Sequence, residues 1–300
     1  MKLKDIRDAL LVPPGKKVKL KDYDPGWAIT KELKELGKDA IKERAQSFLA
    51  SNLDDLAKAQ DLLYASDTYS VLVILQALDA AGKDGTIKHV MSGVNPQGCQ
   101  VYSFKQPSSE ELDHTFLWRC MKALPERGQI GIFNRSYYED VLVVRVHKEL
   151  LANQRLPDDL AKSKKLWKQR FEDINNFEQH LTRNGTVVLK FFLNVSKDEQ
   201  KERFLERLNR PEKHWKFSPQ DVAERKYWDD YHEAYEEALT ATSTDWAPWY
   251  IVPADHKWVT RAVVAGILTH TIQSLDLRYP QLTPAQMAAL DEARRQLEAE

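Results

Sequence analysis

The feature that most constrains the fold is an alternation of short apolar runs with stretches of helical periodicity. The runs are nearly continuous, which is typical of strands buried on both faces of a parallel sheet. They lie at 71–76 (VLVILQ), 100–104 (QVYSF), 129–133 (QIGIF), 186–193 (TVVLKFFL) and 249–252 (WYIV). Because helical patterns separate them, the chain predicts an α/β fold with a five-stranded parallel sheet flanked by helices.

The first part of the chain predicts an arm and two helices. Residues 1–28 are expected to form an irregular basic arm, because VPPGKK and DYDPGW are rich in turn-forming residues. Two helices are expected at 29–49 and 52–66, and Ser51 or Asn52 is expected to cap the second.

The 300 residues are expected to form one domain with an extension at each end. Hydrophobic residues make up 42% of the chain, enough for a sizeable core, and the eight Trp and eleven Tyr argue against disorder. No repeat, low-complexity segment or linker divides the sequence. We therefore expect a core over residues 29–283, followed by an exposed charged helix over 284–300.

Charge and cysteine content exclude several classes of protein. The net charge of −1 provides no global field for a polyanion, so an anion site must be a local cluster. Cys99 and Cys120 lack the spacing of a metal site or a disulfide framework. The N-terminal apolar stretch is short and interrupted by Asp8 and Pro13, unlike a signal peptide or a membrane span. We expect a cytoplasmic protein without nucleic-acid or membrane partners.

The loop after the first expected strand is similar to a phosphate-binding loop. Within LQALDAAGKDGTI (75–87), Gly82 and Lys83 fit the pattern G-x-x-x-x-G-K-S/T, whereas Ala77 replaces its first glycine and Asp84 replaces its hydroxyl residue. A strand–loop–helix context lets backbone amides and the helix N-terminus face an anion, and the lysine adds a mobile cation. We assign phosphate contacts to Gly82, Lys83, Asp84 and Gly85.

The acidic residues of this loop have two interpretations. A carboxylate beside phosphate is repelled unless a cation lies between them, so Asp79 is predicted to be a Mg²⁺ ligand. The alternative is that Asp79 and Asp84 cap the following helix. We favour metal binding for Asp79 and capping for Asp84, and Thr86 is a weaker candidate for the missing hydroxyl.

A second candidate cluster follows the third expected strand. Arg135 emerges at the carboxyl end of a parallel strand, where ligands of open α/β sheets bind, and is predicted to contact phosphate. Asn134 stands where P-loop enzymes commonly place a second acidic metal ligand; it can hydrogen-bond metal-bound water but carries no charge. We assign Asn134 and Glu139 to the acceptor-nucleotide site. Because Glu139 falls in the first turn of the next helix, the alternative is an acid favoured by the helix dipole.

The stretch KERFLERLNRPEKHWKFSPQD (201–221) is strongly basic. Its Arg203, Arg207 and Arg210 have the spacing of one helical face. Beyond Pro211 the charge continues in Lys213 and Lys216. We predict a lid over phosphates at about residues 197–221. The alternative is a solvated helix face with ordinary Glu–Arg pairs.

Charged residues also follow two other expected strands. Lys105 comes just after the second strand and is expected to contact phosphate or an acceptor. Asp255 and Lys257 lie beyond the last strand, at the same sheet edge, although ordinary loop residues are an equally good interpretation.

Together these stretches resemble the family-2 polyphosphate kinases over roughly residues 20–275. The matching text is DAAGKDGTIKHV, SFKQPSSEELDHTFLWR, IGIFNRSYYEDVLVVRVH, QKERFLERLNRPEKHWKFSPQD and APWYIVPADHKWVTR. The resemblance implies a P-loop kinase of thymidylate-kinase-like architecture. Such a kinase moves phosphoryl groups between inorganic polyphosphate and nucleotides with Mg²⁺, and forms a homo-oligomer. The nucleotides are expected to be adenine nucleotides, with guanine nucleotides as the alternative.

The resemblance also implies roles for particular residues. Asp79 and Lys83 match the phosphate-loop acid and lysine, and Arg135 matches the arginine of the second motif. Arg207 and Arg210 match lid positions.

The second motif also indicates a subgroup. Much of the family has an Asp before the motif arginine, so Asn134 is a departure that leaves the metal shell open. Asn134 with YYED resembles the class III subgroup, which phosphorylates both AMP and ADP; the ADP-preferring class tends to have Asn where Glu139 stands.

Two other functions fit the same motifs. One is an ATP-dependent nucleoside monophosphate kinase. The other is a non-catalytic polyphosphate- or nucleotide-binding module, which remains an alternative because Asn134 stands where an acidic metal ligand is usual. Incubation of ADP or AMP with polyphosphate and Mg²⁺, without ATP, separates all three.

Overall fold

The computed structural model describes residues 3–300 and contains a five-stranded parallel sheet in the order β2-β3-β1-β4-β5. The strands are Ser70–Gln76 (β1), Cys99–Ser103 (β2), Ile130–Asn134 (β3), Thr186–Asn194 (β4) and Trp249–Pro253 (β5). Each expected strand is present, and its ends differ from the expected ends by no more than one residue. The predicted α/β fold is confirmed.

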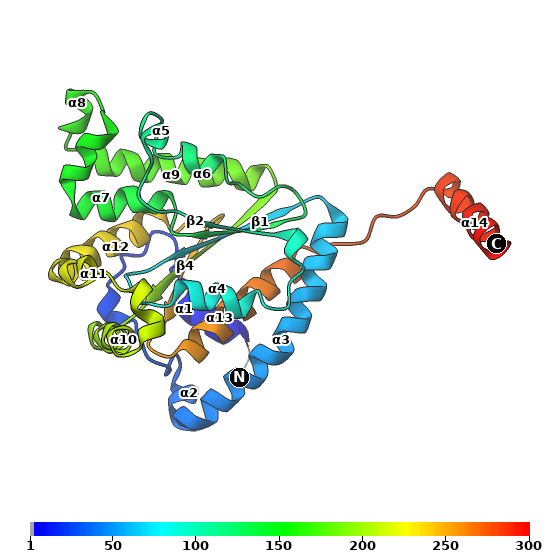
Figure 1. Ribbon diagram of the computed structural model, residues 1–300, viewed down its shortest axis with the longest axis horizontal. Helices are drawn as coiled ribbons and strands as arrows, with labels where there is room; N and C mark the ends of the chain where they lie inside the picture. The colour runs from blue at the N-terminus through cyan, green and yellow to red at the C-terminus, as the bar shows by residue number, and fades with distance from the viewer. Residues whose placement is uncertain (1–2) are drawn as a thin grey trace.

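Helices cover both faces of this sheet (Figure 1). The α-helices are Leu3–Leu10 (α1), Lys31–Leu36 (α2), Lys38–Ser66 (α3), Lys83–Val90 (α4), Ser109–Leu112 (α5), Trp118–Met121 (α6), Val143–Val146 (α7), Asp158–Ala161 (α8), Leu166–Arg183 (α9), Lys197–Asn209 (α10), Pro219–Glu224 (α11), Trp228–Thr242 (α12), Lys257–Gln273 (α13) and Pro284–Glu298 (α14). The 3-10 turns used below are Tyr137–Val141 (η3) and Pro211–Lys216 (η5).

Strand β1 lies at the centre of two hydrophobic cores. Val71, Val73 and Leu75 point into the core formed with α1, α3, α4 and α13, whereas Leu72 and Ile74 point into the core formed with α6, α9 and α12. Since both faces are covered, apolar residues are required at every position, which explains the continuous run in the sequence.

The N-terminal segment differs from the expected irregular arm. It contains α1, and the amide of Val12 donates to the carbonyl oxygen of Trp249 at 2.9 Å, beside an antiparallel bridge between Leu11 and Tyr250. Val12, Val18 and Leu20 are buried. The basic residues of this segment therefore alternate with apolar residues that cover the β5 edge of the sheet.

The division between the first two expected helices was also wrong. The break lies at Gly37, whose φ of 82° ends α2 before α3 begins. Ser51 and Asn52 lie inside α3, and the Asn52 side chain accepts a hydrogen bond of 2.9 Å from Thr269 of α13. Asn52 thus fastens two helices together instead of capping one.

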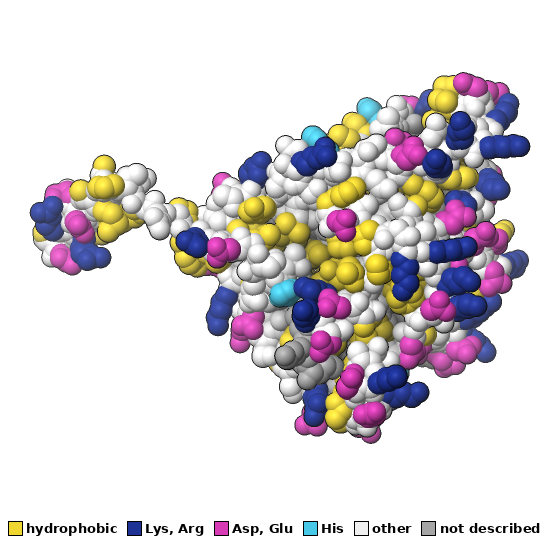
Figure 2. Space-filling view, turned by 180° about the vertical axis from the view of Figure 1, so that it is seen from behind, with side chains coloured by type: hydrophobic (Ala, Val, Ile, Leu, Met, Phe, Trp, Pro, Cys, Tyr) yellow, Lys and Arg dark blue, Asp and Glu magenta, His cyan; other side chains and the backbone are white. Residues whose placement is uncertain are grey.

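The last helix, α14, is exposed along its whole length, as the sequence predicted. Figure 1 shows it projecting from the body at the end of an extended segment, and Figure 2 shows the same projection from behind. None of the helices within residues 3–300 combines the length and apolar composition needed to cross a membrane.

Candidate active site

The phosphate-type loop joins β1 to α4 at the carboxyl edge of the sheet. Gly82 immediately precedes α4 with a φ of 108°, a conformation that favours glycine. Lys83 is the first residue of α4, and its Nζ donates to the carbonyl oxygen of Ala77 at 2.9 Å. Because β1 lies between β3 and β4, this loop is flanked by the ends of both neighbouring strands, which is where open α/β sheets bind ligands.

The fold changes the acidity of Lys83. Burial lowers the pKa of this ammonium group to about 8, and the nearby Arg135 also lowers it, while Asp79, Glu139 and Asp84 oppose the shift. A phosphate placed beside Lys83 favours its charged form. Protonation of Lys83 and binding of an anion are therefore coupled.

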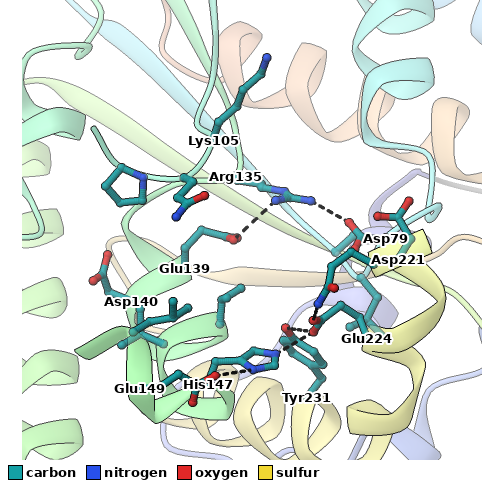
Figure 3. Close-up of a pocket in the computed structure, with 18 of the residues that line it drawn as sticks. Asp79, Lys105, Arg135, Glu139, Asp140, His147, Glu149, Asp221, Glu224 and Tyr231 are labelled. Atoms are coloured by element: carbon teal, nitrogen blue, oxygen red, sulfur yellow. Dashed lines mark hydrogen bonds and ion pairs between the residues drawn. The ribbon is translucent and has the colours of Figure 1, made fainter. Parts of the chain in front are cut away.

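Arg135 lies between two carboxylates (Figure 3). Its Nη2 is 2.7 Å from Oδ1 of Asp79 and its Nη1 is 4.0 Å from Oε2 of Glu139. Its backbone has a φ of 65°, and its amide donates to Leu75 at 3.0 Å. Burial raises the pKa of Glu139, although Arg135 and Lys83 lower it. The phosphate loop and the end of β3 are thus brought together.

Two cavities meet at this arginine. The basic cavity, of about 710 Å³, includes Lys83, Lys105, Arg135, Arg203, Arg207, Lys213, Lys216, Lys257 and Arg261 in its lining. The acidic cavity, of about 520 Å³, is the one drawn in Figure 3, and its lining includes Glu139, Asp140, His147, Glu149, Glu224, Trp228, Tyr231 and Tyr235. Asp79, Lys105, Arg135 and Asp221 line both cavities.

The expected lid consists of α10, η5 and α11. Arg203 of α10 is buried, and its guanidinium donates to the carbonyl oxygens of Ala80 at 2.9 Å and Ala81 at 2.7 Å. Gln200 donates to the carbonyl oxygen of Asp79 at 2.9 Å. Arg203 therefore holds the phosphate loop in place, and its donors are already used by backbone carbonyls and by the carboxylate of Glu199.

The other basic lid residues divide into two groups. Arg207, Lys213 and Lys216 line the basic cavity, and Nζ of Lys216 is 3.8 Å from Oδ2 of Asp84. Arg210 lies outside that lining and pairs with Glu206 at 3.2 Å. The structure therefore brings three of the four expected lid cations to the cavity and places Arg210 elsewhere.

The expected residues around the loop have mixed positions. Asn134 donates to Oδ1 of Asp84 at 2.8 Å and lines the basic cavity, although we expected it beside the acceptor nucleotide. Thr86 donates to the carbonyl oxygen of Gly82 at 3.1 Å. Gly85 lines the same cavity, and Lys105 extends away from Glu139 in Figure 3.

Several lining residues had not been assigned from the sequence. Arg261 follows Lys257 by one helical turn on α13, a spacing that could have revealed it. In the acidic cavity, Nε2 of His147 lies 2.8 Å from Oε2 of Glu224, which also accepts a hydrogen bond from Tyr231 at 2.9 Å. These three residues come from separate elements, so no local pattern connects them.

The oxygen donors fit a metal that arrives with phosphate. Within residues 3–300, no group of three or more His, Cys, Asp or Glu side chains is arranged to hold a metal alone. Mg²⁺ typically uses one or two carboxylates, substrate phosphates and water. Asp79 and Asp221, at the junction of the cavities, are carboxylates of this kind.

Comparison with known proteins agrees with this geometry. The sequence model of "Polyphosphate kinase 2 (PPK2)" matches residues 39–280. The ADP-polyphosphate phosphotransferase of Rhodopseudomonas palustris is 53% identical over 256 residues, which cover 85% of this chain and 89% of that protein. The AMP/ADP-polyphosphate phosphotransferase of Meiothermus ruber is 46% identical over 270 residues, covering 90% and 94%.

A solved structure extends the match to three dimensions. The crystal structure of polyphosphate kinase 2 from Arthrobacter aurescens TC1 superposes with a TM-score of 0.83 at 39% identity, covering 96% of both chains. The sheet, the phosphate loop and the family match agree: this chain belongs to the polyphosphate kinase 2 family.

Proposed function

We propose that this protein transfers phosphoryl groups between inorganic polyphosphate and adenine nucleotides, converting AMP to ADP and ADP to ATP. The observation that carries this assignment is the meeting of a basic and an acidic cavity at Arg135 and Asp79. Family membership and the names of two relatives, which act on ADP or on AMP and ADP, support it.

The basic cavity is the proposed polyphosphate site. Polyphosphate carries a negative charge on each unit, and a groove lined by many Lys and Arg side chains can neutralise several units at once. Lys213 and Lys216 come from the lid, whereas Lys257 and Arg261 come from α13 on the body. The donor chain would therefore lie between the lid and the sheet edge.

The acidic cavity is the proposed acceptor site. Its volume of about 520 Å³ suits a nucleotide, and Trp228, Tyr231 and Val143 give it apolar and aromatic walls for a base. Arg135 lies where the phosphate end of that nucleotide would meet the donor. Glu139 is proposed to support the shorter acceptor, AMP, by holding a cation or ordered water in the remaining space.

The transfer needs no covalent enzyme intermediate. An oxygen of the acceptor phosphate is already ionised, so it can attack the terminal phosphorus of polyphosphate directly. The new O–P bond forms as the bridging P–O bond breaks, and the shortened polyphosphate leaves with the bond electrons. Lys83 and Arg135 are proposed to stabilise the charge of the transferring group, so catalysis rests on positioning and electrostatics.

Mg²⁺ is the proposed cofactor, with Asp79 as its main protein ligand. Bound there, it would reduce repulsion between the two phosphate groups and screen Asp79 from them. In the structure Asp79 instead pairs with Arg135. Asp79→Asn is expected to abolish turnover at ordinary Mg²⁺ and to weaken Mg²⁺-dependent polyphosphate binding measured by calorimetry.

The decisive experiment supplies AMP or ADP with polyphosphate and Mg²⁺ and omits ATP. We expect ADP and ATP to form from AMP, and ATP from ADP, measured by chromatography. Formation of product only after ATP is added would favour an ordinary monophosphate kinase, and binding without product would favour a non-catalytic module.

Self-association into a homo-oligomer, which the family resemblance implies, is a further proposal that light scattering tests.

A further inference from the structure

A buried polar network includes the two residues that precede Glu139, and the proposed mechanism does not use it. Lys190 of β4 and Glu178 of α9 are fully buried, and Nζ of Lys190 lies 2.5 Å from Oε2 of Glu178. Oε1 of Glu178 accepts hydrogen bonds from the hydroxyls of Tyr137 at 2.9 Å and Tyr138 at 2.8 Å. Nζ of Lys190 also donates to the backbone of Thr242 at 2.6 Å.

This network connects η3 to the rigid part of the fold. Tyr137 and Tyr138 are the first two residues of η3, whereas Lys190 belongs to a central strand and Glu178 to a long helix. Tyr138 immediately precedes Glu139. The hydroxyl of Tyr138 both donates to Glu178 and lies 2.9 Å from the Lys190 ammonium group.

The residue after Glu139 is anchored as well. Asp140 accepts from Arg170 at 3.2 Å and from Gln154 at 2.6 Å, and the first of these pairs is buried. Glu139 therefore stands between two residues whose side chains are fixed on different elements. Its own carboxylate faces the acidic cavity, 4.0 Å from Arg135.

A network of this kind is better suited to positioning than to stability. Desolvation of a buried ion pair offsets much of its attraction, and a well-packed apolar replacement is often equally stable. A fully hydrogen-bonded network does, however, permit only one arrangement of its members. Here that arrangement fixes η3 immediately before Glu139, and the separate contacts of Asp140 fix it immediately after.

We propose that Lys190, Glu178, Tyr137 and Tyr138 position Glu139 in the acceptor cavity and thereby set the preference between AMP and ADP. The inference rests on the proposed function, because it concerns the acceptor of that reaction. These four are positioning residues, since they act through Glu139. A purely structural network would affect both acceptors alike.

The test removes hydroxyl groups and keeps the aromatic rings. In Tyr138→Phe and in Tyr137→Phe/Tyr138→Phe, kcat/KM for AMP should fall about tenfold more than kcat/KM for ADP. A displacement of about 1 Å can cost about 10²-fold in rate, so a tenfold loss corresponds to a smaller displacement of Glu139. The KM for polyphosphate should not change. In the Glu139→Gln background, Tyr138→Phe should cause no further change in the AMP-to-ADP ratio, because both act on one group.

Thr269→Val is the matched control, because it removes a buried hydrogen bond of 2.9 Å between α13 and α3, away from η3. It should lower the melting temperature and leave the ratio unchanged. Should the double tyrosine variant fail to fold, Tyr137→Phe alone serves, since Glu178 then keeps Tyr138 and Lys190.

Two results would overturn the inference: equal losses for AMP and ADP in the tyrosine variants, or a ratio that falls further in the Glu139→Gln background. A wild type that makes no product from polyphosphate overturns the proposed function instead. In that case the Kd values for AMP and ADP are measured by calorimetry on the same variants. The inference then requires the affinity for AMP to fall more than the affinity for ADP.

Discussion

Lys83 shows how strongly the fold can change one residue. The sequence predicts a phosphate-loop lysine, but only the structure shows that Lys83 is buried, hydrogen-bonded to the loop carbonyls and close to Arg135. Burial of an ammonium group favours its neutral form. The same residue must be charged to stabilise a transferring phosphoryl group. The rate of transfer should therefore depend on pH through the protonation of Lys83.

We expect kcat/KM for polyphosphate to fall as pH rises above about 8. Because burial lowers the pKa of Lys83 to about 8, this side chain is charged below that pH and neutral above it. The fall should approach about tenfold per pH unit, as for loss of one essential proton. Lys83→Arg should retain charge at high pH and lack this alkaline limb. Lys83→Met should lose about 10²- to 10³-fold at every pH; a flat profile in the wild type would contradict the assignment.

Glu139 permits a second prediction at the residue scale. Glu139→Asn should reduce kcat/KM for AMP much more than that for ADP, because a neutral amide holds a cation or ordered water less well near the shorter acceptor. Glu149→Asn is a matched control: Glu149 lines the same cavity but is exposed. Equal losses for both acceptors would show that Glu139 supports the structure of the site and does not determine the preference for AMP.

At the scale of elements, the lid separates residues that the sequence grouped together. The expected helical face placed Arg207 and Arg210 side by side, but α10 ends at Asn209 and Arg210 adopts an extended backbone with φ −119° and ψ 105°. The helical spacing no longer applies there. Arg210 consequently pairs with Glu206 and Glu212 and does not line the basic cavity.

Because Arg207 lines the basic cavity and Arg210 does not, substitution of Arg210 is a control for substitution of Arg207. Arg207→Ala should weaken polyphosphate binding and make it less sensitive to salt, since each neutralised phosphate contributes to the salt dependence. Arg210→Ala should leave both nearly unchanged. Affinity measured by calorimetry across a salt series tests the pair. Identical behaviour of the two variants would show that the cavity does not bind the donor as proposed.

The same scale explains what sequence could and could not predict. The five strands were predicted almost to the residue, because burial on both faces requires continuous apolar runs. The proximity of Asp79, Lys83 and Arg135 could be predicted because each follows a strand end, and the topology brings these ends together at one edge of the sheet. His147 and Glu224 were missed, because their contact depends on how the end of α7 packs against α11 and produces no periodic pattern in the sequence.

The whole molecule has two extensions of opposite character. The N-terminal segment buries Ile6, Leu10 and Val12 against the body, whereas all residues of α14 are exposed. We therefore propose that the cooperative core includes the N-terminal segment and the lid, and that α14 is a separate unit.

Removal of residues 281–300 should leave the melting temperature and the turnover rate nearly unchanged, because no core contact is lost with α14. Val12→Asp should lower the melting temperature strongly, since it buries a charge without a partner. Differential scanning fluorimetry on both variants makes the comparison. A large loss of stability on truncation would show that α14 belongs to the folded core.

The bridge between Leu11 and Tyr250 also has a consequence for synthesis. Leu11 is translated before all five strands and Tyr250 lies in the last of them, so the N-terminal segment must wait until β1 to β4 have been made. Until then the β5 edge cannot form and Val12 has no burial site. Nascent chains arrested before residue 249 should therefore remain sensitive to protease at their N-termini, and this segment should dock in one of the last steps of folding.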